Sequence, residues 1–159
     1  FRGLSHARPP RKVWSSMSAT RKDIGLNVRQ WIERAQEDLR LSKHAMTMST
    51  AIPYRLVAYH AQQCAEKCLK AYLVAGLTDF PYTHNIGVLL EICAKTAPWV
   101  PKVNDAAILS SYATTARYPG GENRVTKREA IKAIVIAERV SRIVTKDLRE
   151  KKMIAPRRS

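Results

Sequence analysis

The 159-residue sequence is short of cysteine and glycine and has no long apolar run, and each of these features excludes a class of protein. Its three cysteines, Cys64, Cys68 and Cys93, form no CxxC pair and have no histidine at zinc-finger spacing, so neither a disulfide framework nor a zinc site is expected. Six glycines and eight scattered prolines exclude a collagenous or low-complexity chain. No apolar run approaches the roughly 18 residues that a membrane span needs. We therefore expect a reduced, cytoplasmic, globular protein with no metal, no cofactor and no membrane segment.

Basic residues outnumber acidic ones, and 28 Lys and Arg against 13 Asp and Glu give a formal net charge of +15. Much of the excess lies at the two ends of the chain. Basic ends favour contact with polyanions through counterion release, but they are also common as solvated tails. We divide the chain into a basic leader at residues 1–26, a helical domain at 27–149 and a basic tail at 150–159. The leader is expected to be poorly ordered or partly non-native.

Helical periodicity recurs along most of the chain, whereas the alternation of apolar and polar residues that marks a strand is absent. Helices are predicted over residues 28–47, 53–76, 86–96 and 103–116, and from Thr126 to about residue 149. The first of these has an approximate capping box at Asn27 and Gln30, and the last has one at Thr126 and Glu129. The pattern predicts an all-α fold.

The outer side of the last predicted helix is basic. Its side chains recur at spacings of three, four or seven residues, which places them in one stripe: Arg128, Lys132, Arg139, Arg142 and Lys146. The stripe is either a solvated face or a surface that contacts an anion such as nucleic acid.

Four segments together resemble the HEPN domain family. They are WIERAQEDLRLS in the first predicted helix, YHAQQCAEKCLKAYLVAG in the second, THNIGVLL at the start of the third and YATTARYPG after the fourth. The resemblance implies an up-and-down four-helix bundle with an additional short helix, commonly paired as a homodimer. It also implies a partner, since many members act with a minimal nucleotidyltransferase as a toxin–antitoxin pair. Other members are metal-independent endoribonucleases or bind nucleotides.

The ribonuclease members resemble one another in an arginine that is separated from a following histidine by four to six intervening residues. A histidine moves protons near neutral pH and a fixed cation stabilises charge on the phosphate. Here Arg117 is present, but Glu122, Asn123 and Arg124 follow it at the family's spacing, and every histidine of the chain precedes it. The catalytic pair is therefore not carried over, and only Arg117 is a candidate if the protein cleaves RNA.

The polar side of the second predicted helix offers Glu66 and Lys70 at ion-pair spacing, with Lys67 beside them and free for an anion. Together with the loop at Arg117 and Tyr118, this side would supply a phosphate clamp and an aromatic platform. Plain helix packing is the alternative. The candidate residues for binding a nucleotide or a partner are Gln63, Glu66, Lys67, Lys70, His84, Tyr112, Arg117 and Tyr118.

These observations and the resemblance lead to one main expectation and two alternatives. The main expectation is a non-catalytic, dimeric HEPN-domain protein that binds a nucleotide, a partner nucleotidyltransferase or both, in a toxin–antitoxin-like module. The first alternative is a metal-independent endoribonuclease of divergent mechanism. The second is a basic helical protein that binds nucleic acid such as RNA without chemistry.

Overall fold

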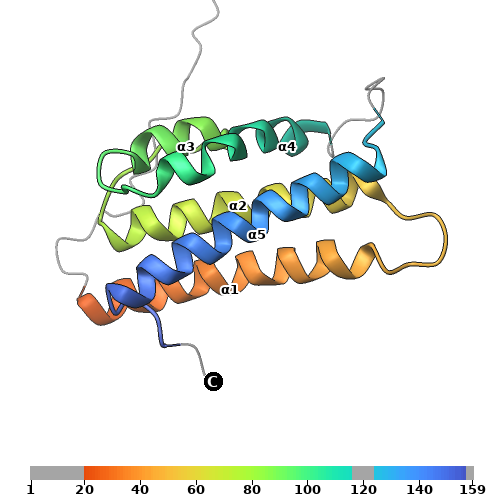
Figure 1. Ribbon diagram of the computed structural model, residues 1–159. Helices are drawn as coiled ribbons and strands as arrows, with labels where there is room; N and C mark the ends of the chain where they lie inside the picture. The colour runs from red at the N-terminus through yellow and green to blue at the C-terminus, as the bar shows by residue number, and fades with distance from the viewer. Residues whose placement is uncertain (1–19, 116–123, 157–159) are drawn as a thin grey trace, which may run out of the picture.

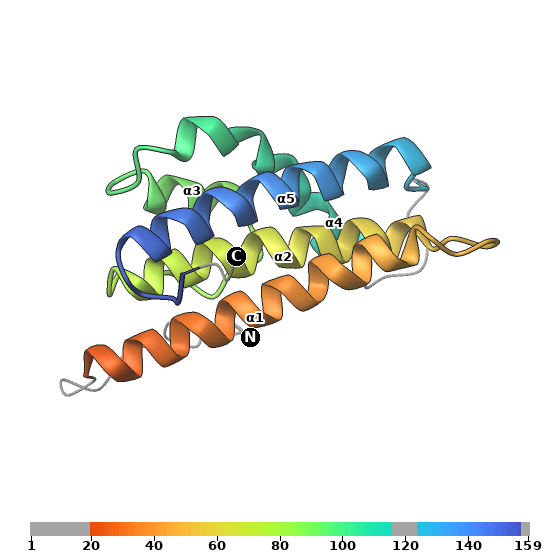
Figure 2. The ribbon, with the colours of Figure 1, turned by 60° about the horizontal axis from the view of Figure 1, so that its bottom comes forward.

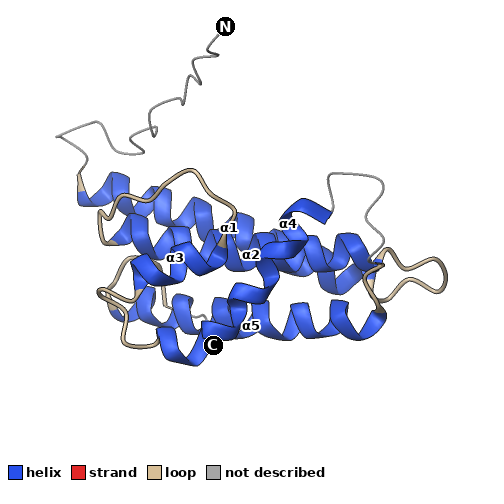
Figure 3. Cartoon of the chain, turned by 90° about the horizontal axis from the view of Figure 1, so that it is seen from above, coloured by secondary structure: helices blue, strands red, loops and turns tan. Residues whose placement is uncertain are grey.

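The computed structural model describes residues 20–115 and 124–156, and Figure 1 shows these as a bundle of helices. The elements in chain order are α1 (Arg21–Ala45), α2 (Tyr54–Ala75), α3 (Ile86–Cys93), the 3-10 helix η1 (Val100–Ser111), α4 (Tyr112–Thr115) and α5 (Lys127–Glu150). Neither described range contains a strand, as Figure 3 shows. The predicted all-α fold is confirmed.

Helix α2 lies at the centre of the bundle. Helices α1 and α5 pack along it, and α3, η1 and α4 lie across α2 and α5 from α1 (Figure 1). In the described part of the chain α1 makes no contact with α3, η1 or α4. Most of α2 is buried, including its polar residues Gln62, Glu66 and Lys70. A helix enclosed by neighbours on several sides must satisfy such groups internally, and this requirement shapes the candidate site described below.

Small side chains let α1 and α2 approach each other closely. Ala35 of α1 and Ala58, Ala61 and Ala65 of α2 are all fully buried. The hydroxyl of Ser42 in α1 donates to a backbone carbonyl of α2 at 3.0 Å, which requires the two helices to be near each other. Beyond their ends, the connecting residues 46–53 extend past the bundle (Figure 2). The two long helices therefore pack closely together at the centre of the fold.

Helix α1 begins earlier than predicted, at Arg21 and inside the segment assigned to the basic leader. The cap is Thr20, whose side chain accepts from the backbone N–H of Asp23 at 3.2 Å, while the Asp23 carboxylate accepts from the Thr20 N–H at 3.0 Å. The predicted capping box at Asn27 and Gln30 is therefore wrong, because both residues lie within the helix. An aspartate at the third position completes the box as a glutamate would.

The predicted fourth α-helix is mostly a 3-10 helix. The buried residues of η1 are Val100, Val103, Ala106 and Leu109, spaced by three, and three residues per turn place them on one edge. Only the last four residues, in α4, are α-helical. An α-helix over residues 103–116 would place Asp105 and Leu109 on one face, but here Asp105 is exposed and Leu109 is fully buried. The third predicted helix also ends sooner, at Cys93.

The capping box of α5 was predicted correctly and gives a first stability test. Thr126 accepts from the Glu129 N–H at 3.2 Å, and the Glu129 carboxylate accepts from the Thr126 N–H at 2.7 Å. Replacing Thr126 by alanine removes the side-chain acceptor and is expected to destabilise the fold by about 1 kcal/mol in urea unfolding. Thr126→Ser retains the hydroxyl and serves as the control. Equal unfolding midpoints for the two variants would contradict a stabilising role for the cap.

Candidate functional site

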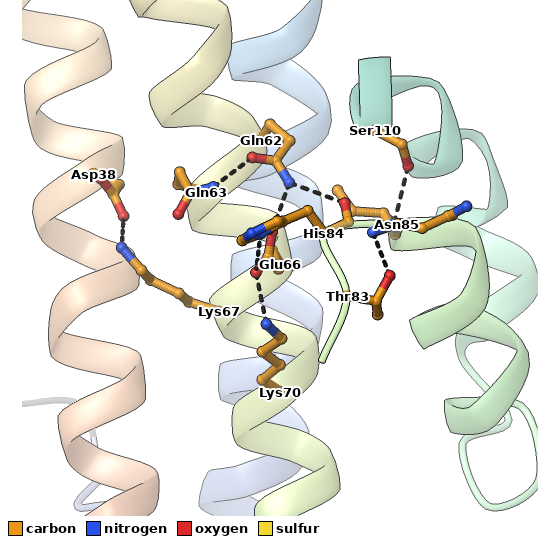
Figure 4. A network of polar contacts seen from close by, with 11 residues as sticks. Asp38, Gln62, Gln63, Glu66, Lys67, Lys70, Thr83, His84, Asn85 and Ser110 are labelled. Atoms are coloured by element: carbon orange, nitrogen blue, oxygen red, sulfur yellow. Dashed lines mark hydrogen bonds and ion pairs between the residues drawn. The ribbon is translucent and has the colours of Figure 1, made fainter. Parts of the chain in front are cut away.

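The candidate site is organised around the Glu66 carboxylate, which is only 3% exposed. It accepts from Lys70 Nζ at 2.7 Å and from Gln62 Nε2 at 2.8 Å, both within α2. His84, in the segment before α3, places Nδ1 3.1 Å from the same carboxylate (Figure 4). Because a carboxylate only accepts, these contacts require a proton on Nδ1 of His84. The cluster therefore ties the segment that leads into α3 to the central helix.

The surroundings of this cluster keep Glu66 ionised. Burial would raise the pKa of Glu66, but the hydrogen bonds and charge of Lys70, with the hydrogen bonds of Gln62 and His84, lower it below its usual value. The Lys70 ammonium also lies 5.9 Å from the ring centroids of Trp31 and Phe80. Aromatic faces at this distance attract a cation. Glu66 and Lys70 thus form the ion pair that the sequence predicted, but in the interior and not on a solvated side.

A second carboxylate forms a separate cluster between α1 and α2. Asp38 of α1 is 9% exposed and pairs with Lys67, and its other oxygen lies 2.8 Å from Nδ1 of His60. The prediction that Lys67 is free for an anion is therefore wrong. A lysine already neutralised by a buried carboxylate is a poor phosphate ligand, since binding phosphate would break the existing pair.

The structure brings only part of the predicted site together. Gln63 lies beside the first cluster and donates to the Gln62 side chain at 2.7 Å. Tyr112 begins α4 and is half-buried, and its burial and the charge of Glu129 raise its pKa. Arg117 and Tyr118, the loop members of the candidate site, lie outside the described residues.

His84 packs against Glu66 of α2 and does not cap helix α3. The cap of α3 is its neighbour Asn85, whose side chain accepts from the Val88 N–H at 3.2 Å. The backbone N–H of Ile86 donates to the hydroxyl of Ser110 at the end of η1, at 2.9 Å (Figure 4). The entry to α3 is therefore held from two sides, by α2 through His84 and by η1 through Ser110.

The basic stripe is present on α5, but its members differ in their partners. Arg139 pairs with Asp105 of η1, and Lys146 lies 3.9 Å from Glu150. Arg128, Lys132 and Arg142 are exposed. Among the residues that the structure describes, the side chains of Lys132 and Arg142 have no hydrogen-bond or ion-pair partner. The charge that remains uncompensated therefore lies along the middle of α5.

Three members of these clusters, Asp38, His60 and Gln62, are not among the candidate residues predicted from the sequence. Asp38 is not predicted because an acidic residue of an amphipathic helix is expected on its charged outer face. Gln62 directly precedes Gln63, which is the only glutamine among the predicted candidates. The i, i+4 spacing of Gln62, Glu66 and Lys70 was the available signal, since it places all three on one face of α2.

Nowhere in residues 20–115 and 124–156 do three or more His, Cys, Asp or Glu side chains gather in a way that suits a metal ion. Within the same ranges, no helix combines the length and apolarity needed to cross a membrane.

Comparisons with known proteins place this arrangement among related folds. A sequence model of the HEPN domain matches residues 28–150. The protein named "Putative toxin MJ1304" of Methanocaldococcus jannaschii is 28% identical over 151 residues, covering 82% of this chain and 95% of that protein. The crystal structure of ST0689, described as an archaeal HEPN homologue, is similar with a TM-score of 0.61 and 29% identity, covering 76% of this chain and 97% of its own. The crystal structure of TT1696 from Thermus thermophilus is similar with a TM-score of 0.63 and 25% identity, covering 76% of this chain and 98% of its own.

Proposed function

The chain belongs to the HEPN domain family, and from this membership we propose that it is a non-catalytic member that acts by binding a partner protein. The proposed partner is a minimal nucleotidyltransferase, in a toxin–antitoxin-like pair, with this chain as a homodimer. The similarity to a protein named as a putative toxin supports the toxin–antitoxin context.

The observation that carries the non-catalytic part is the absence of a histidine after Arg117. Of the four histidines, all of which precede Arg117, His60 and His84 each contact a carboxylate through Nδ1. Both histidine side chains are mostly buried, with exposures of 25% for His60 and 29% for His84, and their contacts hold neighbouring segments of the bundle together. The divergent-ribonuclease alternative would have to place the missing proton-transfer group elsewhere.

The ion pairs of α2 favour a protein partner over a nucleotide. A phosphate clamp on this helix would need a lysine without an internal anion, but Lys67 pairs with Asp38 and Lys70 pairs with Glu66. Removing either lysine from its carboxylate would leave a buried, unpaired charge, which is costly. Binding a partner protein at the surface leaves both pairs intact.

Co-purification and RNA cleavage test this function together. When the full chain is co-expressed with a minimal nucleotidyltransferase encoded beside it, the two are expected to elute as one complex in size-exclusion chromatography. The purified chain is expected to leave tRNA and mRNA uncut. In calorimetry, Lys67→Ala is expected not to weaken any binding of ATP or GTP, because Lys67 is already paired with Asp38. RNA cleavage that Arg117→Ala abolishes would overturn the non-catalytic proposal. Separate elution of the two proteins would overturn the partner proposal.

A further inference from the structure

A groove between α5 and η1 has no role in the function proposed above. Its volume is about 690 Å³, and it is lined by Asp105 of η1 and by Lys132, Val135, Glu138, Arg139 and Arg142 of α5. The pair between Arg139 and Asp105 crosses the groove and joins the two elements. The groove is therefore a fixed feature of the packing of α5 against η1.

Exposed aliphatic side chains lie on the two elements that form this groove, and one of them, Val135, lines it. Val135 is 56% exposed and Ile131, one turn earlier on α5, is 45% exposed. On η1, Ile108 is 48% exposed and lies one 3-10 turn after Asp105, on the same edge of that helix. Three half-exposed aliphatic residues on two adjoining elements give the groove an apolar strip that a bound segment can cover.

The charges around the strip leave a positive excess. Both acidic residues of the groove are already paired, since Asp105 binds Arg139 and Glu138 accepts from Lys43 of α1 at 2.6 Å. Lys132 and Arg142 have no such partner within the described ranges. Val135 lies three residues after Lys132 and four before Arg139, so the apolar strip and the cations share one side of α5.

We propose that this groove binds an acidic amphipathic helix of a partner protein. Apolar side chains one turn apart on that helix would cover Val135, Ile131 and Ile108, while flanking Asp or Glu side chains would pair with Lys132 and Arg142. The stretch from residue 131 to residue 142 is about 16 Å long, which matches roughly three turns of a bound helix. The inference goes beyond the proposed function because it concerns the chemistry of the bound segment and not the enzymatic class of the partner.

Charge complementarity selects this occupant over two others. A second copy of the chain would bring Lys132 and Arg142 against the same cations, and the whole chain carries a net charge of +15. Nucleic acid would satisfy the cations but would leave the aliphatic strip without an apolar partner, since phosphate contacts dominate such binding. An acidic segment with an apolar face satisfies both parts of the groove.

Fluorescence anisotropy with synthetic peptides tests the proposal on the full chain. The probe is a labelled helical peptide of about 18 residues with leucines along one face and glutamates elsewhere, and the matched probe has glutamine in place of every leucine. The leucine peptide is expected to bind at least about tenfold more tightly than its match, because only it covers the apolar strip. The double variant Lys132→Glu with Arg142→Glu and the single variant Val135→Ser are each expected to weaken binding by about tenfold.

Variants on α1 provide controls of the same chemistry. Arg40→Glu changes an exposed basic residue and Leu41→Ser changes an aliphatic residue that is 50% exposed, and both are expected to stay within about twofold of the wild-type affinity. Circular dichroism would show that each variant remains folded, and Ile131→Ser replaces Val135→Ser if that variant does not.

Three results would overturn the proposal. The groove would be a general polyanion surface if the two peptides and single-stranded RNA all bound with equal affinity and Val135→Ser did not change that affinity. Self-association in sedimentation that Val135→Ser abolishes would make it an interface between two copies of this chain. A loss of peptide binding in Arg40→Glu as large as that in the groove variants would place the site elsewhere.

Discussion

Replacing Glu66 by glutamine is expected to destabilise the protein by about 3–5 kcal/mol, because it leaves the Lys70 ammonium buried without its anion. Glutamine retains the size of the side chain, so the loss reports the charge and not a cavity. Side-chain exposures of 4% for Glu66 and 8% for Lys70 leave little water to replace the missing partner. Urea unfolding at neutral pH measures the effect.

The exposed pair between Lys43 and Glu138 is the matched control. Its side chains are 56% and 41% exposed, so water and salt screen the attraction, and Glu138→Gln is expected to cost less than about 1 kcal/mol. Equal losses for Glu66→Gln and Glu138→Gln would contradict a structural role for the buried cluster.

The Glu66 effect should also depend on pH in a definite direction. The pKa of Glu66 is lower in the folded state than its usual value of 4.5, so its ionised form stabilises the fold fully above that pH. As the pH falls through the lowered pKa, Glu66 becomes protonated and its contribution is lost. The difference in unfolding free energy between wild type and Glu66→Gln is therefore expected to shrink in acid and to stay constant around neutral pH.

Leu109→Ala is the second substitution with a large expected effect. Leu109 is the last fully buried residue on the apolar edge of η1, and truncating such a side chain costs about 2–5 kcal/mol. Its neighbour Ile108 is 48% exposed, so Ile108→Ala is expected to cost less than about 1 kcal/mol.

Comparing these two neighbours also tests which edge of η1 packs against the bundle. The buried residues Val100, Val103 and Ala106 precede Leu109 at intervals of three, whereas Ile108 lies on another edge. Thermal unfolding of both variants measures the difference. Similar losses for Leu109→Ala and Ile108→Ala would contradict the observed orientation of η1.

The sequence predicted the helices well where local signals and tertiary packing agree. Thr126 and Glu129 form the predicted capping box, and α2 ends one residue before Gly76 as expected. Even there a detail differs, because the left-handed residue after α2 is Leu77, with φ of 49°, and not the glycine. A non-glycine residue rarely adopts this conformation, so local preference does not predict it here.

The candidate site was less predictable because it depends on burial. The spacing of Glu66 and Lys70 predicted their pairing, but whether that side of α2 faces water depends on the segment around His84 and on α3, far along the chain. The partner of Lys67 comes from another helix, and no local pattern connects Lys67 with Asp38. Most of the helices could therefore be predicted from the sequence, whereas the contacts between them could not.

The winding of η1 also determines how far the chain reaches. Twelve residues in a 3-10 helix span about 24 Å, whereas the same twelve in an α-helix would span about 18 Å. The additional length equals about four residues of the neighbouring α5. A short connecting segment thereby covers more of a long helix than its residue count suggests, and the length over which η1 and α5 can together form a groove depends on this extended winding.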